Sequence, residues 1–209
     1  GTITVRINGG TSTNVYGGGN LAPTNTSTVY LSGGTSTNVY GGGNAANATT
    51  TNVILQGSTV TSIFGGSNQS GTVTNSNITT TSGTATTIYG GNNLGGSTTN
   101  SHLTINGSSI TTVFGGGNEA TTGTTIVNLN NGTIQSVYGG GNKAGINTST
   151  TVNLNGSNVT NLFGGSNESG TVTSSNITTT SGSATTIYGG NNLGGSTNAS
   201  HIIINGWIA

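Results

Sequence analysis

The sequence predicts an all-β protein in which a single parallel β-solenoid domain spans residues 1–209. The first observation is a six-residue motif, aliphatic-aromatic-Gly-Gly-x-Asn, which occurs eight times and begins at residues 15–20. The second is its spacing, which is always 24 or 25 residues. The third is that apolar residues do not recur with the period of about 3.6 residues that an amphipathic helix requires. A strand-rich unit of this length cannot bury its own apolar face, so successive units must stack.

Residues 1–10 alternate apolar and polar side chains and predict a leading strand that ends in a glycine turn. Eight coils follow without a linker, and residues 208 and 209 begin a ninth. Adjacent coils should lie about 4.8 Å apart. The general crossover rule predicts a right-handed winding. The predicted coils are 11–34, 35–58, 59–83, 84–108, 109–132, 133–157, 158–182 and 183–207.

Each coil contains an opening segment, such as 59–64, and a closing segment, such as 151–155. In several coils a third short candidate strand, such as 71–74, lies between the two. Alternation predicts that the closing segments bury two aliphatic columns. The first column contains Val29, Val53, Val127, Val152 and Ile202, and the second contains Leu31, Leu55, Leu129, Leu154 and Ile204.

The motif itself predicts a corner of the coil. Its aromatic residues should stack ring on ring along the rod. Its glycines should provide positive φ or room for a backbone that lies against the neighbouring ring. Its Asn can form a ladder between coils and tolerates left-handed backbone. The predicted aromatic stack is Tyr16, Tyr40, Phe64, Tyr89, Phe114, Tyr138, Phe163 and Tyr188, and the predicted ladder is Asn20, Asn44, Asn68, Asn93, Asn118, Asn142, Asn167 and Asn192.

Composition excludes several classes of function. The chain has two basic residues, two acidic residues and no Cys, so nucleic-acid binding, attraction to anionic membranes and thiolate metal sites are not expected. No apolar run is long enough for membrane insertion. Glu119, Lys143 and Glu168 should form a surface ladder of alternating charge rather than a catalytic pair. We expect no enzyme activity, no cofactor and no metal.

Two histidines occupy equivalent positions in near copies of one sequence. Residues 58–107 and 157–206 are similar at an offset of 99, which indicates duplication of a four-coil unit. His102 and His201 therefore lie four coils apart, too far to share a metal ion.

The opening segments carry Thr-x-Thr at their first and third positions, and alternation places both threonines on one outward face. The first four coils contribute Thr11, Thr13, Thr35, Thr37, Thr59, Thr61, Thr84 and Thr86. This array resembles the ice-binding face of β-solenoid antifreeze proteins. Ser109, Gln135, Asn158 and Ser183 interrupt it in the later coils.

The repeated Val-Tyr-Gly-Gly-Gly-Asn motif, together with Thr-Val-x-Leu-x-Gly strands, resembles the solenoid repeats of large bacterial cell-surface and adhesin-like proteins. The resemblance covers nearly the whole chain and implies a secreted or cell-surface stalk, fibre or adhesive module. The terminal coils show no polar caps, so we expect the chain to associate with itself, end to end or laterally. Ice binding is the alternative function, and a carbohydrate-binding adhesin module that recognises glycans is the second alternative.

Overall fold

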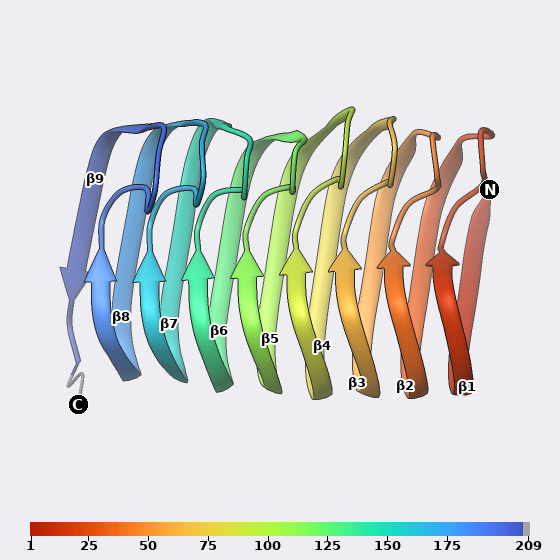
Figure 1. The fold of residues 1–209 in the computed structure, drawn as a ribbon, viewed down its shortest axis with the longest axis horizontal. Coiled ribbons are helices and arrows are strands. Elements are labelled where there is room, and N and C mark those ends of the chain that lie inside the picture. The colour runs from red at the N-terminus through yellow and green to blue at the C-terminus, as the bar shows by residue number, and fades with distance from the viewer. Residues whose placement is uncertain (207–209) are drawn as a thin grey trace.

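The computed structural model describes residues 1–206 and confirms the predicted all-β solenoid (Figure 1). Nine parallel strands are hydrogen-bonded in sequence order as one sheet that winds around the core. The last residue of the predicted coil 183–207 and the predicted start of a ninth coil at residues 208 and 209 lie outside the described residues. The strands are β1 (Thr2–Tyr16), β2 (Thr24–Tyr40), β3 (Ala48–Phe64), β4 (Thr72–Tyr89), β5 (Ser97–Phe114), β6 (Thr121–Tyr138), β7 (Ile146–Phe163), β8 (Thr171–Tyr188) and β9 (Ser196–Ile204).

The register between strands reproduces the sequence repeat. Val15 lies opposite Val39, and Ile63 lies opposite Ile88, so partners are one repeat apart. In Figure 1 the chain advances from right to left, the near segments run upward and the far segments run downward. This is the right-handed sense of winding that the crossover rule predicts.

Each strand combines the closing segment of one repeat with the opening segment of the next. In β3, for example, a single run continues around the corner at Gly57, whose φ is 131°. Glycine is required there because L side chains rarely adopt this backbone conformation. The expected third strand at 71–74 is not separate, because Thr72 begins β4 and the strand continues to Tyr89.

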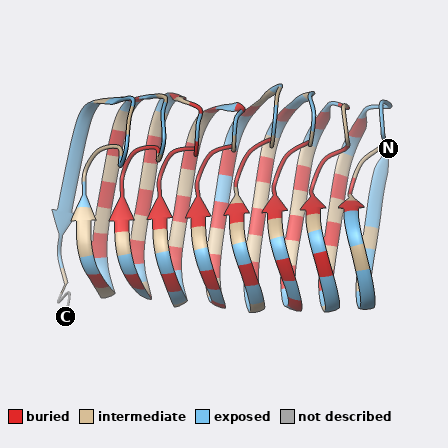
Figure 2. Ribbon diagram, viewed as in Figure 1, coloured by how far each residue is buried: buried red, intermediate tan, exposed pale blue. Residues whose placement is uncertain are grey.

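The core lies between the closing and opening segments, and buried residues recur along the strands between less buried ones (Figure 2). Alternate side chains therefore point inward. Val53 and Leu55 from a closing segment and Ile63 from an opening segment are fully buried. Ile202 and Ile204 differ from the prediction. They continue the same columns, but 41% and 58% of their surfaces are exposed because β9 pairs with β8 alone.

A column of buried hydroxyl groups closes the coil across its interior. Thr51 Oγ1 donates to the carbonyl of Gly65 at 2.6 Å, and Ser101 Oγ donates to that of Gly115 at 2.6 Å. The partners lie 14 residues apart, so each bond joins the closing segment of one repeat to the glycine corner of the next. A buried carbonyl without a partner would cost about 1–3 kcal/mol, so these hydroxyls stabilise the corner. The other members are Ser27, Ser76, Thr125 and Thr150.

Candidate functional site: the corner and the threonine face

The glycines of the motif are required by the neighbouring coil and not by their own φ angles. None of them has a positive φ, so positive φ is the wrong explanation for these glycines. The motif Asn residues do not adopt a left-handed backbone either. A Cβ on Gly115 would collide with the carbonyl oxygen of Gly139 and approach Val127 Cγ2 to 3.0 Å. The obstacle is thus backbone and core side chain rather than the adjacent ring.

The eight aromatic rings form one continuous stack along the corner. Neighbouring ring centroids are 4.8–5.0 Å apart and the interplanar angles are 1–13°. Phe114, Tyr138 and Phe163 are buried in a cluster separate from the main core. Tyr188, in the last complete coil, is 49% exposed. The spacing of the rings matches that of the strands, because each aromatic residue is the last residue of its own strand.

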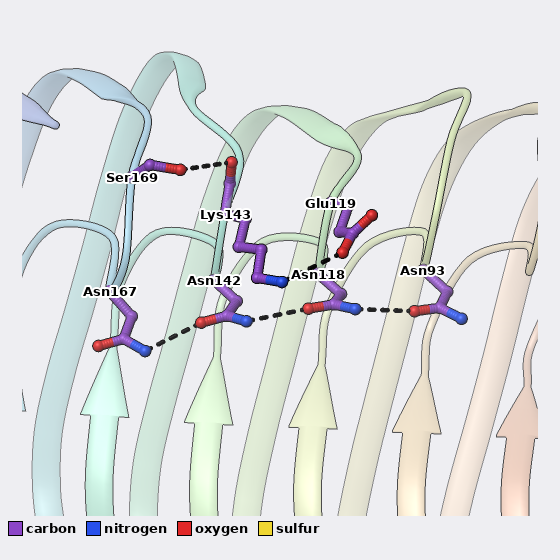
Figure 3. Close-up of polar contacts among 7 residues, drawn as sticks. All are labelled: Asn93, Asn118, Glu119, Asn142, Lys143, Asn167 and Ser169. Atoms are coloured by element: carbon purple, nitrogen blue, oxygen red, sulfur yellow. Dashed lines mark hydrogen bonds and ion pairs between the residues drawn. The ribbon is translucent and has the colours of Figure 1, made fainter. Parts of the chain in front are cut away.

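The asparagines that end the motif are joined side chain to side chain through all eight copies, and Figure 3 shows the part of this ladder from Asn93 to Asn167. In each link, Nδ2 of one Asn donates to Oδ1 of the Asn in the preceding coil, over 2.9–3.0 Å. Asn118, for instance, donates to Asn93 and accepts from Asn142. Each side chain inside the ladder therefore uses one of its two N–H donors and one of the two lone pairs of its oxygen within the ladder.

The tyrosine hydroxyls lie beside this ladder. Tyr16 Oη accepts from Asn68 Nδ2 at 3.3 Å, two coils further along the chain. Burial raises the pKa of Tyr40, Tyr89 and Tyr138 above the ordinary value. For Tyr89 the negative charge of Glu168 acts in the same direction, as a smaller cause. These hydroxyls therefore remain protonated at neutral pH.

The charged side chains follow the corner Asn on successive coils, but only one ion pair is formed among residues 1–206. Lys143 Nζ lies 3.3 Å from Glu119 Oε1 (Figure 3). Both side chains are more than 40% exposed, at 46% and 44%. Glu168 lies on the next coil, where its backbone nitrogen donates to Asn142, yet its carboxylate makes no ion pair with Lys143. The expected ladder of three alternating charges is therefore a single pair.

The histidines are on the outside of the closing segments. His102 Nε2 lies 2.8 Å from Asn128 Nδ2, one coil away, and His201 is exposed on β9. Within the described coils, no three His, Cys, Asp or Glu side chains come close enough together to hold a metal ion.

The threonine face is an exposed, in-register surface on the opening segments. Thr11, Thr35, Thr59 and Thr84 are consecutive partners in the sheet, and Ser109 and Thr133 continue the file. The second file runs from Thr13 through Thr37, Thr61 and Thr86, and all of these side chains are exposed. Residues between the files point inward, as Val60 does.

Two shallow hollows accompany these features. One, of about 430 Å³, lies where the ring stack and the Asn ladder begin, and Tyr16, Gly18, Asn20 and Asn44 line it. The other, of about 240 Å³, is lined by Pro23, Thr24, Asn47, Ala48, Thr49, Thr72 and Thr74. Neither is lined by a carboxylate, a basic group or an imidazole.

The inner hydroxyl column is the element that sequence reasoning missed. Its signal was present as a Ser or Thr 14 residues before the first glycine of a corner, but Ser and Thr are so frequent here that the position did not stand out.

These features define the class of protein as a parallel β-solenoid repeat protein. Comparison of the chain with models of protein families, with curated protein sequences and with solved structures found no significant match. No helix among residues 1–206 is long and apolar enough to cross a membrane.

Proposed function

We propose that this chain is a structural solenoid rod that forms or belongs to a fibre or adhesin stalk outside the cell or at its surface. The observation that carries the proposal is the continuity of the corner. Seven consecutive ring contacts and the accompanying Asn ladder run through every described coil without interruption. Rods assembled from such quasi-one-dimensional repeats gain stability with each added coil.

The last described coil supports end-to-end growth. Tyr188, Ile202 and Ile204 are exposed there, whereas their equivalents in the middle coils are buried. Burial of apolar surface is worth about 25 cal/mol per Å². A further coil, from the same chain or from another copy, would therefore be favourable at this position.

Electron microscopy and sedimentation of the purified chain test the assembly. We expect particles one coil wide that lengthen with protein concentration. The variant Ile202→Lys/Ile204→Lys should remain short, because it places two charges on the end surface. The matched control Thr178→Lys, on the outward face of β8, should lengthen like the parent. A monomer at every concentration, unaffected by salt, would exclude growth by stacking.

The location has its own test. Antibodies raised against the purified chain should label intact cells of the producing organism, or its secreted material. Labelling that requires permeabilised cells would contradict a role at the surface.

Ice binding is the second candidate, because the exposed threonine files are in register on a regular sheet. It predicts a gap between melting and freezing temperatures and faceted ice crystals. Thr37→Tyr and Thr61→Tyr should abolish both effects by breaking the flat array. Thr104→Tyr is the matched control: it lies on the closing segment in the column of Tyr30, and it should leave the activity intact.

A further inference from the structure

We propose that Asn131 is a site of spontaneous modification, at which the side chain cyclises onto Gly132 and yields aspartate or isoaspartate. Five Asn-Gly pairs occur in the sequence, at 8–9, 106–107, 131–132, 155–156 and 205–206. Three of them, led by Asn106, Asn131 and Asn155, lie in interior strands with a neighbour on both sides. The three have the same reactive dipeptide, so the structure decides between them.

Asn131 is turned toward its own backbone. The nitrogen of Gly132 donates to Asn131 Oδ1 over 2.9 Å, which is the one hydrogen bond of this side chain within the described coils. The attacking nitrogen is thereby held beside the carboxamide. Asn131 is exposed, so water reaches the group. The φ of Gly132 is 128°, in a region that is open to glycine.

The two comparison residues are held away from this geometry by neighbouring coils. Asn106 Oδ1 accepts from Asn130 Nδ2 at 2.9 Å. Asn155 donates to Asn130 Oδ1 at 3.2 Å and accepts from Thr180 Oγ1 at 2.9 Å. Cyclisation at either residue must first break these bonds between coils.

The difference arises from where the dipeptide lies relative to the bend inside each strand, the bend that contains Gly57 in β3 and Gly132 in β6. Asn131-Gly132 directly precedes Thr133, the first residue of its opening segment. In two other coils the same two positions are occupied by Ser82-Gly83 and Ser181-Gly182. Asn106-Gly107 and Asn155-Gly156 begin one residue earlier, on the outward column that links successive coils.

The reaction balances without an oxidant or a cofactor. A bond forms between the Gly132 nitrogen and Asn131 Cγ, the bond from Cγ to Nδ2 breaks, and ammonia leaves with the proton that the Gly132 nitrogen gives up. Water then opens the five-membered imide at either carbonyl. Each event adds one negative charge to a chain whose formal net charge is zero. Opening toward isoaspartate also inserts a methylene group into the backbone of the corner.

Peptide mass spectrometry of the intact, folded chain after incubation in mildly alkaline buffer measures the rates, and isoaspartyl methylation identifies the product. We expect modification at Asn131 to be about tenfold faster than at Asn106 or Asn155, which corresponds to about 1.4 kcal/mol in the barrier. In denaturant the three rates should converge. Equal rates in the folded chain would overturn the proposal, as would a preference for Asn131 that persists after unfolding.

Two variants test the corner geometry directly. Asn131→Ser introduces the residue that the chain uses at 82 and 181, so it should fold normally and lose the fast event. Ser82→Asn creates an Asn-Gly pair at the same corner position, and a second fast site should appear at residue 82. If the fold of Ser82→Asn is intact by circular dichroism and residue 82 reacts no faster than Asn106, the corner geometry is not the cause.

Discussion

Glycine at the first position of the corner, as at Gly115, leaves space that the next coil occupies. The backbone of Gly139 and the side chain of Val127 fill the volume that a Cβ would need. Since both belong to well-packed neighbours, they cannot move aside without disturbing a further coil.

We therefore expect Gly115→Ala to lower the free energy of unfolding by about 1–3 kcal/mol, the usual cost of overpacking. Gly9→Ala is the matched control, because no atom lies within 4 Å of the position of its Cβ. Urea denaturation followed by circular dichroism measures both variants. A loss of equal size at both positions would show that the cost comes from strand propensity and not from the neighbouring coil.

Two threonines interrupt the aliphatic column of the closing segments. Thr80 lies between Leu55 and Ile105 in the sheet, and Thr179 occupies the same place 99 residues later. Both are fully buried, and neither hydroxyl has a hydrogen-bond partner within the described residues.

Thr80→Val should raise the free energy of unfolding by about 1 kcal/mol, because it removes a buried hydroxyl that pairs with nothing. Thr51→Val should lower the free energy of unfolding by about the same amount, because the Thr51 hydroxyl donates a hydrogen bond to the Gly65 carbonyl. Denaturation curves of the two variants should shift in opposite directions. A shift in the same direction would mean that the Thr80 hydroxyl has a partner such as an internal water.

At the scale of the element, the tyrosines of the ring stack make the stability of the fold depend on pH. The pKa values of Tyr40, Tyr89 and Tyr138 are raised in the fold, chiefly by burial. The folded chain thus holds these protons more tightly than the unfolded chain, whose tyrosines titrate at about pH 10. The associated stability is present below that pH and is lost as pH rises through the folded-state pKa values.

We expect the denaturation midpoint to be flat near neutrality and to fall above about pH 10. The double variant Tyr40→Phe/Tyr138→Phe should show a smaller alkaline loss. Phe64, Phe114 and Phe163 already occupy this column, so the substitution fits the stack. An unchanged alkaline loss in the double variant would assign it to other groups.

At the scale of the whole molecule, cohesion comes from stacked neutral groups and hardly from charge. The formal net charge is zero, and the one ion pair among residues 1–206, Lys143 with Glu119, is exposed. Surface pairs of this kind contribute about 0–1 kcal/mol and are screened by salt.

Stability should consequently change by less than about 1 kcal/mol between low salt and about 0.5 M NaCl, and Lys143→Gln should change it by no more than that. Thermal or urea denaturation across a salt series measures both. A large salt dependence would indicate that charges between separate rods, rather than within one, contribute to the stability that is measured.

The sequence by itself determined the architecture of this protein. A motif that returns every 24 or 25 residues requires equivalent residues to lie one strand spacing apart, so the ring column and the Asn column follow from the repeat alone. Alternation likewise placed Val53 and Leu55 inside and Thr59 outside.

Only the tertiary structure decided what depends on contacts between coils and across the interior. Positive φ occurs at Gly57 and its equivalents rather than in the repeated motif, because the motif glycines are selected by steric room. The hydroxyls of the Thr51 column find carbonyls on the far side of the coil, which no local pattern reveals. Lys143 forms its ion pair with Glu119 and not with Glu168. Asn131 accepts a hydrogen bond from the next backbone nitrogen, whereas Asn106 accepts one from Asn130 in the next coil. In each case the repeat sets which residues are neighbours, and the three-dimensional packing sets which of the possible bonds is made.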